Sequence, residues 1–178
     1  MEAVVVSDTN IFIDLISVGL LDEFFHLPFE IHTTDLIVHE LKDNMQQSIV
    51  QKYIISNQLH VKKYDGKELI SLAIMKNRVS KDCNATIQDC SVWLYADENG
   101  YSLLTGDAKL RRAAEKSGVD VHGILYIFDK LVEHGVIDYV IAKGKIVMLS
   151  QVNNRLPMKE IQKRISAWEA KITERRSR

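Results

Sequence analysis

Short apolar segments alternate with longer amphipathic segments over most of the chain, and this alternation constrains the fold more than any other feature. Strands are expected at residues 4–6, 30–33, 59–64, 101–105 and 119–121. Helices are expected between them, many beginning at Ser, Thr or Asp capping residues. Strands that alternate with helices pair in parallel and are covered by the helices. The pattern therefore predicts an α/β fold.

The alternation ends near residue 136. Residues 137–149 are rich in β-branched side chains, but Gly144 interrupts them, so strand and helix remain equally good interpretations. Pro157 then opens a helix over residues 158–171, with Ile161, Ile165 and Trp168 on one face. The only boundary worth proposing therefore falls near residue 136, and it separates residues 1–136 from residues 137–178.

Composition limits the classes of protein to which the chain can belong. The 178 residues suffice for one domain with a sizeable core, and 46% of them are hydrophobic. The formal charge of -1 argues against wholesale binding of nucleic acid by bulk positive charge, but it leaves room for a local basic surface. No apolar run approaches the roughly 20 residues that cross a bilayer. The expectation is a soluble protein without a membrane contact.

Two cysteines, Cys83 and Cys90, are too few for a disulfide framework. Neither belongs to a CxxC or Cys/His cluster, so the cysteines do not predict structural zinc. Buried thiols suit a reducing compartment, and the expected location is the cytoplasm.

Four acids occupy informative positions. Asp8 directly follows the first expected strand, and Asp107 follows the strand at residues 101–105. Ligands of open parallel sheets bind beyond the carboxyl ends of the strands, where these two side chains can meet. Glu40 and Asp89 lie about one turn into helices, beside apolar residues. An acid near a core-facing stripe must be paired, protonated or bound to metal.

Convergent carboxylates repel one another unless a cation intervenes, and such hard oxygen ligands suit Mg²⁺ or Mn²⁺. An ion held there could activate water for attack on a phosphodiester. Each acid also has a simpler interpretation. Asp8 and Asp107 could be only helix N-caps, and Glu40 could be an ordinary surface acid beside His39 and Lys42. Convergence of the four is therefore inferred from their placement.

Taken together, the acids and their neighbours resemble the motifs of the PIN domain family of metal-dependent ribonucleases. The four motifs appear in order: Asp8-Thr9-Asn10 after a strand, Glu40 in a helix, Asp89 in a helix, and Thr105-Gly106-Asp107 after a strand. The resemblance covers about residues 3–135. It implies a three-layer fold with roughly five parallel strands and helices on both faces. It also implies that Asp8, Glu40, Asp89 and Asp107 are catalytic metal ligands, supported by Asn10 and Thr105.

Two further features refine the resemblance. Many PIN domains carry another acid two or three residues after the fourth-motif aspartate, where this chain has Lys109 and Leu110. This departure from the family pattern counts against a second metal position. The segment around Gly123 resembles a subgroup with additional C-terminal helices. That likeness favours helix for residues 137–149, with residues 137–178 packed as an extension on the catalytic domain.

Binding of RNA requires cations near the acids. Lys109, Arg111 and Arg112 follow Asp107, and at least one is expected to face the cleft; Lys42 and Lys81 are further candidates. Each could equally be a solvated surface charge. Trp93 and Trp168 are expected to pack in the core rather than to stack on bases.

The leading hypothesis is a metal-dependent endoribonuclease that cleaves single-stranded RNA, and a toxin of a toxin–antitoxin pair is one form of that hypothesis. An antitoxin partner and a homodimer are implied by the resemblance alone. The alternative is a PIN-like module that binds RNA or protein without cleaving. A haloacid dehalogenase-like phosphohydrolase would need an acid where Asn10 stands, and a dinucleotide enzyme would need a glycine-rich loop after the first strand.

Overall fold

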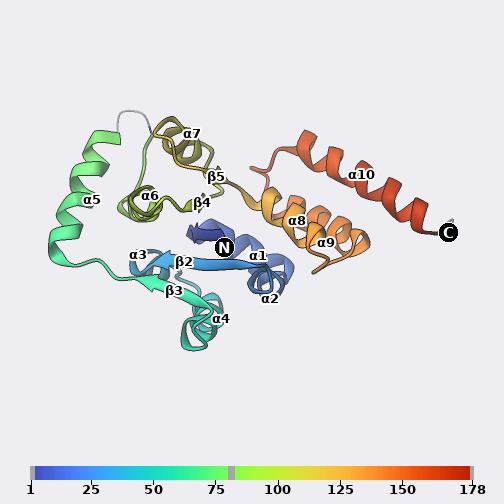
Figure 1. The fold of residues 1–178 in the computed structure, drawn as a ribbon, viewed down its shortest axis with the longest axis horizontal. Helices are drawn as coiled ribbons and strands as arrows, with labels where there is room; N and C mark the ends of the chain where they lie inside the picture. Colours follow the sequence, from blue (N-terminus) through green and yellow to red (C-terminus); the bar gives the residue numbers. More distant parts are fainter. Residues whose placement is uncertain (1–2, 80–82, 177–178) are drawn as a thin grey trace. The chain divides into compact units, whose positions relative to one another are not determined.

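The computed structural model describes residues 3–79 and 83–176 (Figure 1). The chain forms two compact units, one of residues 1–13 and 28–124 and the other of residues 14–27 and 125–178. Helix α1 (Thr9–Val18) begins in the first unit and ends in the second. The predicted boundary near residue 136 follows the sequence pattern rather than these contacts, and it stays a prediction.

The described part of the first unit is built on a five-stranded parallel sheet with the order β3-β2-β1-β4-β5. The strands are β1 (Ala3–Ser7), β2 (Phe29–Thr34), β3 (Leu59–Lys62), β4 (Ser102–Leu104) and β5 (Val121–His122). The central strand β1 buries Val5, Val6 and Ser7 in succession, as expected for a strand covered on both faces. The α/β class and the parallel sheet are therefore confirmed.

The strand order reverses direction beside β1. The chain runs from β1 to β2 and β3 on one side, and then returns to add β4 and β5 on the other. The carboxyl ends of β1 and β4 therefore form the switch point at which open parallel sheets bind ligands. The backbone N–H of Asp8 donates to the carbonyl of Leu104 at 3.0 Å, and this bond joins the two strand ends.

Several helices of the first unit begin at side-chain caps, and two of these caps, Thr34 and Asp107, are as the sequence indicates. The helices after α1 in this unit are α3 (Asp35–Glu40), α4 (Asn44–Ile55), α5 (Gly66–Val79), α6 (Ile87–Asn99) and α7 (Ala108–Lys116). Thr34 caps α3, Thr86 caps α6 and Asp107 caps α7 through side-chain oxygens. Helix α6 packs on β1, β2 and β4, and α5 packs on α6.

The last strand of the sheet starts two residues later than predicted. The strand expected at residues 119–121 is found at Val121–His122. The N–H of Val119 instead donates to the carbonyl of Ala114 at 3.1 Å, because that bond closes the end of α7. Val119 is therefore part of the turn, and pairing with β4 starts later.

The second unit is helical. It contains the last part of α1 together with α2 (Leu21–Phe25), α8 (Ile124–Glu133), α9 (Tyr139–Val152) and α10 (Met158–Arg176). Residues 137–149 fall almost entirely in α9, whose N-terminus is capped by Asp138, so the helix interpretation is correct. Helix α10 packs against α9 (Figure 1), and Ile161, Ile165 and Trp168 are buried on one face as predicted.

Polar contacts also hold the second unit together. The amide of Asn153 donates to both carboxylate oxygens of Asp14 at 3.0 Å, which ties the end of α9 to α1. Arg164 of α10 forms a two-pronged contact with Asp129 of α8 at 2.8 and 2.6 Å. These contacts fix the C-terminal helices relative to the end of α1.

Two further expectations concern the whole chain. Cys83 and Cys90 are both buried thiols, and no disulfide joins them. Among the described residues, no helix combines the length and the apolar character that a membrane span requires.

Candidate metal centre

Asp8 is the buried centre of a hydrogen-bond network at the carboxyl end of β1. Only 1% of Asp8 is exposed. Its Oδ1 accepts from the backbone N–H of Thr9 at 2.7 Å, and its Oδ2 accepts from the Thr105 hydroxyl at 2.8 Å and from the Asn10 amide at 3.3 Å. The structure therefore places the two predicted supporting residues, Asn10 and Thr105, directly on this carboxylate.

Burial perturbs the ionisation of Asp8. Loss of hydration, together with the nearby charge of Asp89, raises the pKa of Asp8 from 3.8 to about 6. The hydrogen bonds from Thr105, Thr9 and Asn10 oppose this rise because they favour the charged form. A carboxylate that is costly to ionise in its site is well suited to a cation that would offset the cost.

Glu40 joins the network through Thr9. The Thr9 hydroxyl donates to Oε2 of Glu40, while the Thr9 backbone N–H donates to Asp8. One residue at the start of α1 therefore holds two carboxylates together. Glu40 is the last residue of α3, so the helix presents it at the carboxyl edge of the sheet.

Asp89 lies in the first turn of α6 and serves that helix directly. Its Oδ2 accepts from the backbone N–H of Thr86 at 2.7 Å and from the Thr86 hydroxyl at 2.9 Å, and its own N–H donates back to the Thr86 hydroxyl. This reciprocal capping box orients the side chain. The charge of Asp89 still lies close enough to Asp8 to affect its ionisation.

Asp107 is the N-cap of α7. Its Oδ1 accepts from the backbone N–H groups of Lys109 at 2.6 Å and Leu110 at 2.9 Å. Its own N–H donates to the Thr105 hydroxyl at 3.1 Å, and that hydroxyl in turn donates to Asp8. Thr105 therefore links the capping turn of Asp107 to the buried carboxylate of Asp8.

Asp89 and Asp107 line one cavity of about 330 Å³ between the starts of α6 and α7, together with Cys83, Asn84, Ala85, Ala108, Lys109 and Leu110. Within the described ranges, the four acids do not bring three carboxylate oxygens within 4.8 Å of one another. They form two linked pairs, with Asp8 and Glu40 joined by Thr9, and Asp89 and Asp107 facing the cavity.

Comparison with known sequence families shows to which family this chain belongs. Residues 4–170 match the sequence profile of a family described as PIN domain (DUF3368). The chain belongs to the PIN domain family. No protein of curated function matches it in sequence.

Comparison with solved structures shows similarity of fold. PAE2754 from Pyrobaculum aerophilum is similar with a TM-score of 0.51 and 18% identity, over 75% of this chain and 99% of that one. VapBC2 from Rickettsia felis, solved bound to a DNA fragment from its promoter, is more distant. Its TM-score is 0.46 and its identity 14%, and the match covers 67% of this chain and 98% of that one. The first similarity supports the PIN-like arrangement of a parallel sheet with helices.

The three predicted RNA-binding residues of this PIN domain differ in their surroundings. Lys109 is exposed and lines the cavity that holds Asp89 and Asp107. The guanidinium of Arg111 packs against Gly123, so closely that a Cβ atom added to this glycine would lie 2.1 Å from a guanidinium nitrogen. The Nε of Arg111 is buried without a hydrogen-bond partner. Arg112 is exposed, and its Nε donates to the carbonyl of Ala108. Of these three residues, Lys109 is therefore the one that lies beside the acids.

Two further basic residues, Lys42 and Lys81, were candidates for RNA binding. Lys42 follows the end of α3 and is exposed. Lys81 lies outside the described residues.

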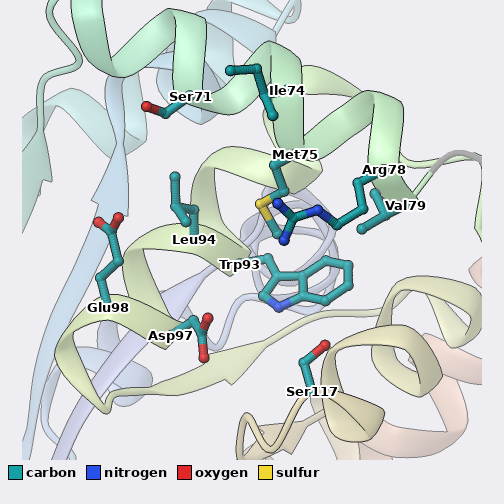
Figure 2. A pocket seen from close by; sticks show the side chains of 10 residues that line it. All are labelled: Ser71, Ile74, Met75, Arg78, Val79, Trp93, Leu94, Asp97, Glu98 and Ser117. Atoms are coloured by element: carbon teal, nitrogen blue, oxygen red, sulfur yellow. The ribbon is translucent and has the colours of Figure 1, made fainter.

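A second cavity, of about 320 Å³, lies between α5 and α6 and contains none of the predicted acids. Figure 2 shows Met75 and Arg78 of α5 pointing toward the indole of Trp93 on α6. Trp93 is 3% exposed and Trp168 is 6% exposed. Both tryptophans are therefore core residues, as expected, rather than base-stacking platforms.

The chemistry of the acidic site fits a divalent cation. All of its ligands would be carboxylate oxygens, which Mg²⁺ and Mn²⁺ prefer. Among the described residues, no lysine, arginine or histidine forms an ion pair with Asp8, Glu40, Asp89 or Asp107. The buried carboxylate of Asp8 has three hydrogen-bond donors but no cationic partner in that part of the chain, and a metal ion would supply the opposite charge.

Sequence reasoning missed the role of Thr9. The motif Asp8-Thr9-Asn10 contained the signal, because a hydroxyl adjacent to a buried carboxylate is able to contact a second acid. Its partner could not be identified, since Glu40 is 31 residues away and meets Thr9 only in the folded chain.

Proposed function

We propose that this PIN domain is a metal-dependent endoribonuclease that hydrolyses phosphodiester bonds of single-stranded RNA. The observation that carries the proposal is Asp8, a buried carboxylate at the switch point of the sheet that has hydrogen-bond donors and no cation among the described residues. Asp8, Glu40, Asp89 and Asp107 are the proposed catalytic residues and metal ligands.

A bound Mg²⁺ or Mn²⁺ would supply an activated water and neutralise charge on the scissile phosphate. The residues of this chain would set the geometry. Thr9 and Thr105 orient Asp8 and Glu40 through their hydroxyls, and Thr105 also fixes the turn that carries Asp107. Lys109 is positioned to bind an RNA phosphate beside the cavity. Nothing in this arrangement reads a base sequence.

The experiment is cleavage of an unstructured RNA in Mn²⁺ by the wild type, Asp89→Asn and Asp97→Asn. The substitution Asp89→Asn preserves the shape of the side chain and the cap of α6 while removing the charge. Asp97 is an exposed acid near the other end of the same helix, so its variant is the matched control. We expect cleavage by the wild type and Asp97→Asn only. Equal cleavage by all three proteins would refute the assignment.

A toxin role, with an antitoxin protein as partner and a homodimer as the assembly, is the finer form of the proposal and rests on family resemblance. Expression of the protein alone should slow growth of its host cell, and Asp8→Asn should remove this effect. A well-expressed wild type that leaves growth unchanged would exclude the toxin role while leaving the nuclease open.

A second candidate is a PIN-like module that binds RNA or protein without cleaving. Two observations favour it: Lys109 replaces an acid that many PIN domains carry, and both Asp89 and Asp107 already accept hydrogen bonds that cap their helices. Binding of the RNA without cleavage, in Mn²⁺ and at enzyme excess, would support this module over the nuclease.

A further inference from the structure

A cluster of two histidines and one glutamate lies on the two strands at one edge of the sheet. Glu30 and His32 are two residues apart in β2, so their side chains lie on the same face of the sheet. His60 of β3 is the residue paired with His32. One ligand atom from each of Glu30, His32 and His60 lies within 4.8 Å of the other two. The parallel register brings these three side chains together.

The contacts within the cluster converge on one carboxylate oxygen. Oε1 of Glu30 lies 2.8 Å from Nε2 of His32 and 4.0 Å from Nε2 of His60. The edges of a tetrahedral zinc site with bonds of about 2.0–2.1 Å are roughly 3.4 Å long. Small shifts of Glu30 and His60 would reach that geometry, and both side chains are about half exposed, so they are able to move.

The surroundings of His32 resemble those of a metal-bound imidazole. His32 is only 8% exposed, and its Nδ1 lies 2.7 Å from the hydroxyl of Tyr95 on α6. A histidine that binds a metal through Nε2 almost always donates its other ring N–H to an oxygen, which fixes the tautomer and the ring. The rings of Tyr95 and Tyr101 pack around His32 and hold it further.

We propose that Glu30, His32 and His60 form a binding site for Zn²⁺, separate from the acidic centre. Two imidazoles and one carboxylate suit Zn²⁺, whereas the all-oxygen acidic centre suits Mg²⁺ or Mn²⁺. The half-exposed side of the cluster leaves the fourth position to water. On α6, Tyr95 lies six residues beyond Asp89, about 9 Å along the helix axis, so the two sites share a helix but no residue.

The site would join an edge strand to the body of the sheet. Strand β3 lies at one end of the strand order and pairs only with β2 among the described strands. A metal bound by residues of both strands would stabilise the folded protein, because the unfolded chain does not hold these ligands together.

The test is calorimetric titration with Zn²⁺ in the Asp89→Asn background, chosen because loss of a proposed ligand should weaken metal binding at the acidic centre. We expect the background protein to bind one Zn²⁺ per chain. The affinity for Zn²⁺ should be at least roughly thirtyfold weaker in His60→Ala and about 10–100-fold weaker in Tyr95→Phe. His134→Ala, which changes an exposed histidine of the second unit, should bind as the background does. Zn²⁺ should also raise the unfolding temperature of the background but not that of His60→Ala.

The controls separate loss of the site from loss of the fold. His60 is half exposed, so His60→Ala should unfold at the background temperature in the presence of a chelator. Zn²⁺ binding that is unchanged by His60→Ala, or no binding at about 100-fold excess of free Zn²⁺ over protein, would overturn the proposal. Neither outcome would affect the nuclease assignment, since RNA cleavage in Mn²⁺ is measured without Zn²⁺.

Discussion

The hydroxyl of Thr105 donates a 2.8 Å hydrogen bond to the buried carboxylate of Asp8, across 97 residues of sequence. The same hydroxyl accepts the backbone N–H of Asp107 at 3.1 Å. Thr105 is completely buried at the end of β4, beside the end of β1. One side chain therefore connects two predicted metal ligands at the switch point of the sheet.

Removing this hydroxyl should shift the pH dependence of RNA cleavage. Thr105→Val keeps the shape of the side chain, but Asp8 loses a donor that lowers its pKa, so protonation should compete with metal binding at higher pH. A hydrogen bond to a charged group contributes about 1.5–3 kcal/mol, so the rate should fall roughly tenfold or more near pH 6 and recover toward pH 8. Rates measured from pH 5.5 to 8.5 check this. Thr105→Ser should follow the wild type, and a Val variant with an unshifted profile would contradict the role of Thr105.

Asp8 should destabilise the metal-free protein at neutral pH. The folded protein holds a proton on Asp8 up to about pH 6, whereas the unfolded chain releases it near pH 3.8. The contribution of Asp8 to stability is therefore present below about pH 4 and is lost as the pH rises through 6. In a chelator at pH 7.5, Asp8→Asn should be more stable by up to about 3 kcal/mol, and the gain should vanish at pH 4.

Urea unfolding at the two pH values measures this difference. Saturating Mn²⁺ should stabilise the wild type but not Asp8→Asn. A wild type that is the more stable protein at pH 7.5 without metal would show that Asp8 is adequately compensated by its hydrogen bonds alone.

Lys109 should contribute to RNA binding more than to chemistry. Lys109→Ala removes the exposed cation that lines the cavity of Asp89 and Asp107, so KM for RNA should rise by roughly three- to tenfold with little change in kcat. The slope of log affinity against log salt should fall by about one. Lys116→Ala changes an exposed lysine at the far end of α7 and serves as the control. Equal effects of the two substitutions would exclude a specific role for Lys109.

Trp93 should act on stability and not on RNA. Trp93→Ala removes a large side chain from a residue that is only 3% exposed, and should cost about 3–5 kcal/mol. Trp93→Phe retains most of the packing and should leave RNA affinity within about twofold of the wild type. Denaturant unfolding and RNA binding measure the two effects. A large loss of RNA affinity in a stable Phe variant would restore the base-stacking interpretation.

Strands and helix starts that depend on local sequence pattern were predicted correctly. The run at residues 4–6 identified the central strand, and the capping residues Thr34 and Asp107 marked helix starts. Pattern alone did not distinguish strand from helix at residues 137–149, because β-branched side chains there face a helical packing environment; the family resemblance selected the helix that the structure contains.

Contacts between residues far apart in the chain could not be predicted from the sequence. Asp107 was a candidate for both capping and metal binding, and the structure shows the cap while leaving the ligand role to experiment. The grouping of Glu30 and His32 with His60 depends on the register of β2 and β3, which a single sequence does not specify. Register and side-chain convergence follow from tertiary packing, and they decide which polar residues become neighbours.

The most direct test of the acidic centre is calorimetric titration with Mn²⁺ of the wild type, Asp89→Asn and Asp97→Asn. We expect saturable binding by the wild type and by Asp97→Asn. Binding by Asp89→Asn should be at least roughly tenfold weaker, because the loss of a ligand should cost no less than the loss of a residue that only supports a ligand. The assignment of this centre as a metal site would be contradicted by a wild type that binds no Mn²⁺ at millimolar concentration, or by three proteins with the same affinity.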